Sequence, residues 1–572
     1  MNAHSNMDAE KAFDPNLKHE VEVPSGSDDG HGTYEERPPF MTRMGLTADS
    51  FRRRTLDDKH NQLNKTMKTR HLHMIAIGGS IGAGLFVGSG GALRRGGPAA
   101  LIIGFGIIGV MMFNVVYALG ELAYVYPISG GFYTYSVRFI DPSWGFAMGW
   151  NYVAQWAVVL PLELTVAALV VNSFDGFNIN IAVFITVFLV AIIIISIFGV
   201  LGYAEEEFWV SALKLSAVVV FLIMGLVFVL GGGPSDGEFS TYQGGKRWHN
   251  PGAFANGFLG VCQVFVTAAF SFSGTELVGL AAAESATPQK SLPGAIKQVF
   301  WRITLFYILS LLFVGLLVDH NDPRLLGDPN ASGLINVASS PFKIVADAGG
   351  VPGFGIFINI VVLLAVVSIG LSGVYGGSRT LTALAEQGYA PKIFCYIDKA
   401  GRPLYSTLFI IAFGPLAYLG LASSGETVFN WLLSLSGLAA LFTWGSICLA
   451  HIRYRAAWKY NGHSLDELPF KAVFGVYGSW VGLILVVLVL IAQLYTAIQP
   501  MDVEAFFLNY LAFFVVVFFY LVGYAWKRGR WIKIHEIDID SGRRAIDYEA
   551  FEAEKLRTKN HGAFRRFMGK MF

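Results

Sequence analysis

The sequence predicts an all-α polytopic membrane protein with twelve transmembrane helices, a five-plus-five inverted-repeat core and broken first and sixth helices. Three observations lead to this fold class. The 572 residues are 54% hydrophobic and only 15% charged, whereas an ordinary soluble domain is about 25% charged. The chain contains twelve apolar runs in succession. Most of them have the length of about 20 residues that a helix needs to cross a bilayer. Two of these runs are interrupted by small and polar residues.

The composition also excludes several partners. A formal net charge of +1 gives no basic surface of the kind that binds nucleic acid. The three cysteines, Cys262, Cys395 and Cys448, lie far apart without the spacing of a metal site, and we interpret them as packing thiols. We therefore expect no metal and no cofactor.

The chain divides into three parts. Residues 1–70 are polar and lack the apolar core of a signal peptide, so we expect a disordered cytosolic tail. Residues 71–526 form the transmembrane domain and residues 527–572 a second cytosolic tail. An even number of spans places both tails on one side, and the excess of Lys and Arg in the loops of that side indicates the cytosol. Asn330, followed by Ala and Ser, then lies outside as a candidate glycosylation site.

Eleven apolar runs follow the first span. Their expected bounds are Ala99–Tyr124, Ala147–Val171, Ile181–Val200, Phe208–Leu230, Phe254–Ala283, Val299–Val318, Val351–Leu384, Leu408–Leu421, Val428–Ala450, Val481–Ile498 and Phe506–Ala525.

The first span, His71–Gly97, has an unusual middle. Small residues gather there within the apolar run: Gly78, Gly79, Ser80, Gly82 and Gly84. Each glycine costs a helix interior about 1 kcal/mol relative to alanine, and broken backbone persists at membrane depth only where protein buries it or a cavity adjoins it. The alternative is that these glycines serve only close helix packing. A break would expose backbone amides that attract an anionic group such as a carboxylate.

The sixth span has a second interruption of the same kind. Its small and polar residues are Ser271, Ser273, Gly274, Thr275 and Glu276. The two interrupted spans lie five spans apart and cross the membrane in opposite directions, which is the pattern of an inverted repeat with two further spans at its end. The second interruption favours a binding site over packing alone.

Charged residues inside membrane spans are costly and indicate function. Lys214, about two turns into the fifth span, and Glu163, just after Pro161 in the third, are the candidates for proton coupling. Burial favours the neutral form of an amine, so a lysine that loses and regains a proton can couple transport to a proton gradient. The alternative is a fixed ion pair that only locks helices together. Glu121, near the tail end of the second span, is better explained as structural.

Two facing breaks predict a site for a zwitterion. Backbone amides of the first break can bind a carboxylate, and carbonyls that both breaks leave free can bind an ammonium group. The site would therefore recognise the backbone of an amino acid. The expected substrate-binding residues are Ser80, Ile81, Gly82, Ala83, Gly84, Phe272, Ser273, Gly274, Thr275 and Glu276. Pairing of Glu276 with unwound backbone is an equal alternative to contact with a ligand. Phe86 and Phe270 are further aromatic candidates, although core packing is the simpler explanation for each.

Long motifs are spread over many of the spans. They include IAIGGSIGAGLFVGSG, ALGELAYVYPISGGFYTYSVRFIDPS, QWAVVLPLE, FSFSGTELVGLAAAES and VFNWLLSLSGLAALFTWGSICLAHIRYR. Over about Met67–Asp547 the chain resembles the fungal amino-acid permeases of the amino acid–polyamine–organocation superfamily, most closely the general amino-acid permeases. The resemblance implies the inverted-repeat core, a place in the plasma membrane and uptake of amino acids together with protons.

The resemblance also implies roles for single residues. Lys214 falls where proton-driven relatives carry a lysine in place of a sodium ion, and Glu163 matches the acidic residue that typically follows a Pro-Leu pair in the third span. Family members are removed from the membrane by ubiquitination of lysines in the N-terminal tail. Lys11 and Lys18 are therefore candidate sites, and ubiquitin-ligase machinery is a candidate partner.

The expected function is proton-coupled uptake of amino acids across the plasma membrane with broad specificity. One alternative is a permease restricted to proline or to basic amino acids, and another is an amino-acid sensor with little flux. Near the breaks the sequence has no nucleophile–base pair and no metal cluster, which argues against an enzyme. No ring of like residues is repeated, which argues against a channel.

Overall fold

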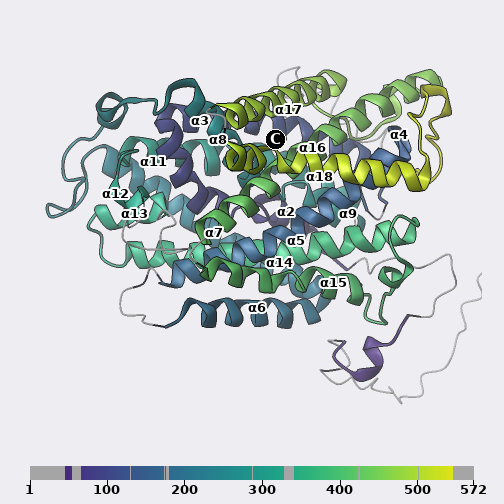
Figure 1. The fold of residues 1–572 in the computed structure, drawn as a ribbon, viewed down its shortest axis with the longest axis horizontal. Helices are drawn as coiled ribbons and strands as arrows, with labels where there is room; N and C mark the ends of the chain where they lie inside the picture. Colours follow the sequence, from purple (N-terminus) through teal and green to yellow (C-terminus); the bar gives the residue numbers. More distant parts are fainter. Residues whose placement is uncertain are drawn as a thin grey trace, which may run out of the picture.

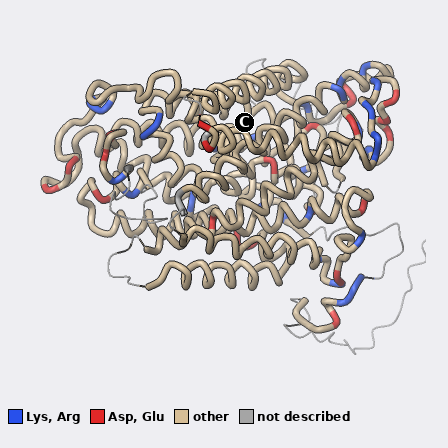
Figure 2. The backbone as a smooth tube through the Cα atoms, in the orientation of Figure 1, with Lys and Arg blue, Asp and Glu red and all other residues tan. Residues whose placement is uncertain are grey.

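The computed structural model describes residues 45–54, 66–128, 130–172, 179–285, 288–326, 340–422, 425–499 and 502–544, with residues 41 and 174. Its long helices run side by side along the longest dimension of the molecule (Figure 1). Most charged residues lie at the two ends of this bundle (Figure 2). Lys11, Lys18 and Asn330 lie outside the described residues.

The helices have the following bounds. The longer ones are α2 (Thr69–Gly78), α3 (Ser89–Val125), α5 (Pro142–Asn172), α6 (Ile181–Ile197), α7 (Gly199–Val229), α8 (Gly257–Phe272), α10 (Pro288–Trp301), α14 (Phe354–Glu386), α16 (Gly425–Tyr460), α17 (Gly475–Ile498) and α18 (Val503–Lys527). The shorter ones are α4 (Phe132–Phe139), α9 (Leu277–Ala283), α11 (Ser310–Leu317), α12 (Pro323–Leu326), α13 (Pro341–Ala348) and α15 (Leu404–Ile411). Three π-helical turns are η2 (Gly84–Gly88), η3 (Trp248–Gly252) and η4 (Arg302–Leu309), and the 3₁₀ turns are η1 (Ala48–Phe51), η6 (Lys392–Cys395), η7 (Gly414–Leu421), η8 (Leu465–Glu467) and η9 (Ile534–Glu536).

The prediction of an all-helical polytopic membrane protein is confirmed. Within the described residues, ten helical stretches have the length and hydropathy of a membrane span, and α6 is a shorter apolar helix of 17 residues. One of the ten, Gly84–Val125, turns at Gly97, where φ is 80°. That stretch therefore holds the second half of the first predicted span and all of the second. Length and hydropathy alone therefore give ten spans in the described part of the chain and not the twelve predicted. The fourth predicted span, α6, is too short to be counted, and the first predicted span is counted together with the second.

The fifth predicted span begins earlier than expected. Its helix, α7, starts at Gly199 and not at Phe208, so Lys214 lies near the middle of the helix and not two turns from its start. The earlier start is possible because the acidic residues that the extension brings into the helix find partners on neighbouring helices. Arg70 of α2, for example, pairs with Glu205 at 2.5 Å.

The N-terminal segment 45–54, which the sequence assigns to a disordered tail, packs against the loop between α14 and α15. Lys399 of that loop pairs with Asp49 at 2.7 Å, and the Arg54 amide donates to the Ile397 carbonyl at 3.0 Å. Short-range pairing with one loop holds this segment in place of the apolar core that it lacks.

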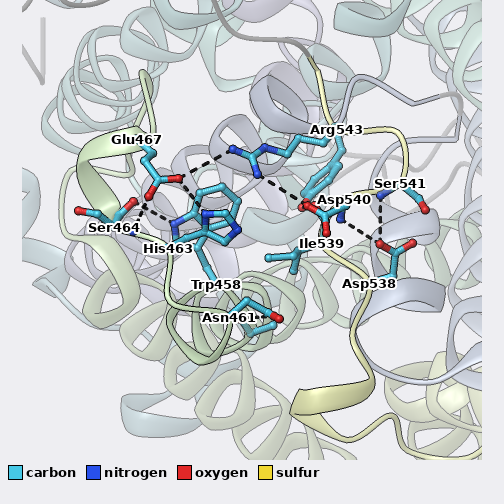
Figure 3. A network of polar contacts seen from close by, with 12 residues as sticks. Trp458, Asn461, His463, Ser464, Glu467, Asp538, Ile539, Asp540, Ser541 and Arg543 are labelled. Atoms are coloured by element: carbon cyan, nitrogen blue, oxygen red, sulfur yellow. Dashed lines mark hydrogen bonds and ion pairs between the residues drawn. The ribbon is translucent and has the colours of Figure 1, made fainter. Parts of the chain in front are cut away.

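The residues after α18 also pack against the bundle (Figure 3). Arg543 lies 3.9 Å from Glu467 and its guanidinium stacks 4.7 Å above the Trp458 ring. Asp538 accepts a hydrogen bond from the Ser541 amide at 3.0 Å. Hydrogen bonds from Ser541 hold the pKa of Asp538 low, at about 2.

The described parts of both tails lie at the same end of the bundle. Lys527, the last residue of α18, places its amine 4.9 Å from the ring of Tyr389, in the loop region that also binds the N-terminal segment. We call this end the tail side.

Candidate functional site

The two interrupted spans are broken helices that touch. The first break, residues 79–83, separates α2 from η2, and the second break, residues 273–276, separates α8 from α9. A Cβ added to Gly84, directly after the first break, would lie 2.6 Å from the Ser271 Cα. Only glycine fits there, so the backbones of the two spans lie in direct contact.

Gly274 makes a second contact of this kind. Its φ is 93°, in the left-handed region, and an added Cβ would lie 2.9 Å from the carbonyl oxygen of Gly79. Glycine tolerates both the left-handed φ and the short distance to this oxygen, because it has no Cβ. The two breaks therefore form one closely packed unit.

A small cavity adjoins both breaks. Its lining residues are Ser80, Gly82, Ala83, Gly84, Trp156, Val159, Glu163, Phe270, Ser273 and Ile369. They come from the first break and η2, from α5, from the end of α8 with the second break, and from α14. The cavity wall thus brings together five of the predicted substrate-binding residues and Glu163. The five are Ser80, Gly82, Ala83, Gly84 and Ser273.

Ile81 and Phe272, also predicted to bind substrate, do not line this cavity. The Ile81 amide donates to the Gly78 carbonyl at 3.0 Å, and its side chain is buried. The Phe272 ring stacks on Tyr307 with the ring centroids 4.2 Å apart. Phe270, two residues earlier on α8, faces the cavity instead.

Glu276 holds the second break together. One carboxylate oxygen accepts hydrogen bonds from the Tyr152 hydroxyl and the Gly274 amide, each at 3.2 Å. The other accepts from the Trp444 indole at 3.2 Å. This geometry agrees with the structural alternative for Glu276, because its carboxylate is already bonded within the protein.

Arg302 and Tyr307, on the π-helical turn η4, tie the two breaks to each other. Arg302 is buried, and its Nη1 and Nη2 donate to the Ala76 carbonyl and the Thr275 hydroxyl, each at 2.5 Å. The Tyr307 hydroxyl lies 3.1 Å from the Ser80 carbonyl and 2.7 Å from the Ser271 carbonyl. Sequence reasoning missed both residues. An arginine inside the seventh predicted span was the available signal.

Lys214 reaches the start of the first break from α7. Its amine donates to the carbonyl of Gly78, the last residue of α2, at 3.1 Å. It also lies 3.5 Å from the Glu207 carboxylate, and both side chains are fully buried. Glu207 accepts further hydrogen bonds from Ser211 at 2.6 Å and Ser368 at 2.5 Å. Sequence reasoning missed Glu207 because the fifth span was expected to begin after it.

Glu163 is in a different situation. Its side chain is buried in the cavity wall, and neither carboxyl oxygen has a hydrogen-bond partner among the described residues. It lies close to the backbone of Ala83 and within electrostatic reach of Lys214. An unpaired buried carboxyl is costly, so this group either carries a proton or awaits a ligand.

Comparison with known proteins points to transport. The model of the family described as "Amino acid permease" matches residues 71–536. The chain is 59% identical to the amino-acid permease inda1 of Hypocrea atroviridis, over 93% of this chain and 94% of that protein. It is 50% identical to the general amino-acid permease GAP1 of Saccharomyces cerevisiae, over 86% of this chain and 82% of that protein.

Two further similarities are more distant. Cationic amino acid transporter 1 of Schizosaccharomyces pombe is 44% identical over 88% of this chain and 86% of that protein. A solved structure of a Na⁺-coupled sialic acid symporter covers 78% of this chain and 94% of its own, with 13% identity and a TM-score of 0.44. The likeness to that structure is too weak to add to the other matches.

Proposed function

The chain belongs to the amino acid permease family, whose members are transporters and not enzymes, and we propose that it takes up a broad range of amino acids together with protons. We propose that it lies in the plasma membrane, as the resemblance to fungal amino-acid permeases implies, with the tail side in the cytosol, as the distribution of Lys and Arg along the chain indicates. Similarity to a general amino-acid permease supports broad specificity. Similarity to a cationic amino acid transporter favours one alternative, a permease for basic amino acids.

The cavity wall supports recognition of the amino-acid backbone. Gly82, Ala83 and Gly84 bring main chain and no large side chain to the cavity, which suits close approach of a substrate carboxylate to the amides that begin η2. Ser80 and Ser273 add hydroxyls from the two breaks. Groups common to all amino acids would make these contacts, and the side chain would extend toward Phe270 and Ile369.

The observation that carries proton coupling is the contact between Lys214 and the end of α2. The Lys214 amine donates to the Gly78 carbonyl and lies 3.5 Å from the Glu207 carboxylate. A proton that moves among Lys214, Glu207 and Glu163 would change how firmly α2 is held at the first break. Substrate and proton shift such an equilibrium only if they bind one conformation more tightly than the other. Binding both in the same conformation therefore couples their movements.

Reconstituted vesicles with an imposed pH gradient test this proposal. We expect the native chain to accumulate several labelled amino acids against their gradients, and Lys214→Met to abolish accumulation while the protein still reaches the membrane. Lys343→Met is the matched control, because the Lys343 amine pairs with Asp347 of its own helix, α13. Normal pH-driven accumulation in Lys214→Met would refute the role of the lysine.

Two alternatives have their own measurements. Competition of uptake by each amino acid in a permease-deficient fungus, at several pH values, separates a broad permease from one for basic amino acids or proline. Flux in the same vesicles separates a transporter from a sensor, since a sensor would bind amino acids with little flux.

Regulation through the N-terminal tail is a further part of the proposal. Lys11 and Lys18 would accept ubiquitin from a ligase and so mark the protein for removal from the membrane. Replacing both by Arg should prolong residence at the cell surface without changing uptake per molecule. Unchanged residence would exclude these two lysines as the sites.

A further inference from the structure

A second cavity lies near the tail side, among α6, α7, α14 and α15. Figure 1 shows α6, α14 and α15 side by side at one edge of the bundle. The cavity is lined by Ser196, Gly199, Tyr203, Leu371, Val374, Tyr375, Arg379, Arg402, Pro403 and Thr407. We call it the tail-side cavity. It shares no lining residue with the cavity at the breaks.

Three hydrogen-bonding groups in this lining lack partners. Nη2 of Arg379, Nη2 of Arg402 and Oγ of Ser196 are buried and make no hydrogen bond with any described residue. The two arginines are only 6% and 5% exposed. A buried donor without an acceptor is costly, and three of them around one cavity call for a ligand that accepts hydrogen bonds.

The remaining nitrogens of the two arginines are held firmly. Arg402 donates from Nε to Asp398 at 2.7 Å and from Nη1 to the Ile197 carbonyl at 2.5 Å. Arg379 donates from Nε to Glu284 at 3.1 Å, and its guanidinium stacks 4.4 Å above the Tyr375 ring. Each guanidinium is therefore fixed in orientation, with its terminal Nη2 amino group left without a partner among the described residues.

The surroundings of the cavity indicate where a ligand would come from. Phe51 of the N-terminal segment stacks 4.1 Å from the Arg402 guanidinium and so covers it. Ile197, Leu201 and Leu408, each one or two residues from a lining residue, are exposed on helices that we assign to the membrane. An apolar exterior beside a pocket of N–H donors suits a molecule with an anionic head and acyl chains.

We propose that the tail-side cavity binds a phosphate-class oxyanion, independently of the transport function proposed above. The planar fork of arginine matches phosphate oxygens, and basic pockets between helices on the cytoplasmic side of membrane proteins hold anionic lipid head groups. Asp398 and Glu284 already balance the two arginine charges. Recognition therefore rests on short-range hydrogen bonds from the three unpaired groups. The phosphate is carried by a lipid or is free in solution, and the chemistry at the arginines is the same.

Thermal unfolding of the purified full chain in maltoside detergent without phosphate provides the test. One arm adds sodium phosphate against sodium chloride at equal ionic strength. The other adds phosphatidic acid against diacylglycerol with the same acyl chains. Ligand-dependent stabilisation should appear with phosphatidic acid. A rise also with inorganic phosphate would identify a site open to solution, and a rise with neither would overturn the proposal.

Matched variants locate the effect. Arg402→Lys keeps a cation beside Asp398 but removes the unpaired Nη2, and the ligand concentration for half-maximal stabilisation should rise about tenfold, as for one lost hydrogen bond between charged groups. Arg324→Lys, an arginine that pairs with Asp322 far from the tail-side cavity, should leave it unchanged. Ser196→Ala is the milder second variant if Arg402→Lys does not fold. An unaltered dose response in both Arg402→Lys and Ser196→Ala would overturn the assignment to this cavity.

Discussion

The two breaks are built from similar residues but use their polar groups differently. Three of the five residues of the first break, Ser80, Gly82 and Ala83, face the cavity. In the second break only Ser273 does, while Glu276 and Thr275 are bonded to Tyr152, Trp444 and Arg302.

We interpret this difference as a division between a break that contacts the substrate and a break that supports the structure. A buried polar group that already has its partners must lose them before it binds a ligand, and each loss is costly. We therefore assign contact with the substrate mainly to the first break, and rigid support of that break to the second. Each prediction below tests this division, starting with the largest expected effect.

Gly84→Ala should eliminate transport of all substrates together. The new Cβ would lie 2.6 Å from the Ser271 Cα and 2.9 Å from its nitrogen, and backbone atoms cannot move away as a flexible side chain can. Gly106→Ala, at a glycine with no atom within 4 Å of an added Cβ, is the control and should transport normally. Uptake of several labelled amino acids, divided by the amount at the cell surface, measures both. Selective loss of one amino acid would show that the first break reads side chains.

Arg302→Lys should lower the maximal rate about tenfold without changing the order of preference among amino acids. Lysine keeps the charge but cannot donate to both Ala76 and Thr275 in the geometry of the guanidinium. Losing one charge-assisted hydrogen bond costs about 1.5–3 kcal/mol. Initial rates over a range of substrate concentrations distinguish the maximal rate from KM. A changed order of preference would mean that the second break also touches substrate.

Ser273→Ala and Thr275→Ala form a matched pair within the second break. Ser273 faces the cavity and accepts from Gln155 at 2.6 Å, so its loss should raise KM severalfold, as for one neutral hydrogen bond of about 1 kcal/mol. Thr275 contacts Arg302, so its loss should lower the maximal rate and leave KM unchanged. Equal effects on KM would remove the distinction between the two positions.

The smallest expected effect is that of pH on the packing of the C-terminal segment after α18. This segment is a reference for pH effects outside the two breaks. The pKa of Asp538 is lowered from 3.8 to about 2 by hydrogen bonds from Ser541. Its contribution to docking is therefore complete above about pH 4 and is lost only as pH falls through about 2. The protection of the amides of residues 528–544 against hydrogen exchange, relative to the intrinsic exchange rate at each pH, should be the same at pH 5 and pH 8. Lower protection at pH 5 would show that acid loosens the tail side as a whole, and a pH dependence of transport would then not report on the breaks alone.

The fold class and the existence of two breaks could be predicted because both are written in local composition. Apolar runs reveal spans, and clustered glycines reveal the first break. The side-chain partners could not be predicted in the same way. Whether Glu276 faces a ligand or its own helix depends on Tyr152 and Trp444, which lie more than a hundred residues away in sequence.

The missed residues have different causes. Glu207 lies one residue before the predicted start of the fifth span, Phe208, whereas Lys214, Ser211 and Ser368 allow it inside a helix. Arg302 lay inside a predicted span and its charge should have marked it. No local pattern signals the docking of the N-terminal segment, since it depends on a loop more than three hundred residues later.

The sharp turn at Gly97 has a mechanical consequence. The outer part of the first span continues through this turn into the second, and hydrogen bonds of Gly96 and Ala99 fasten the turn to the strip of chain before α8. On the tail side of the first break the span continues as α2, which is about 15 Å long. Lys214 and Arg302 bond to its end near the break through the Gly78 and Ala76 carbonyls, and Glu205 bonds to its tail-side end through Arg70. We therefore expect a passage toward the tail side to open by movement of α2 once these bonds are released, while the turn at Gly97 holds the other half of the span in place.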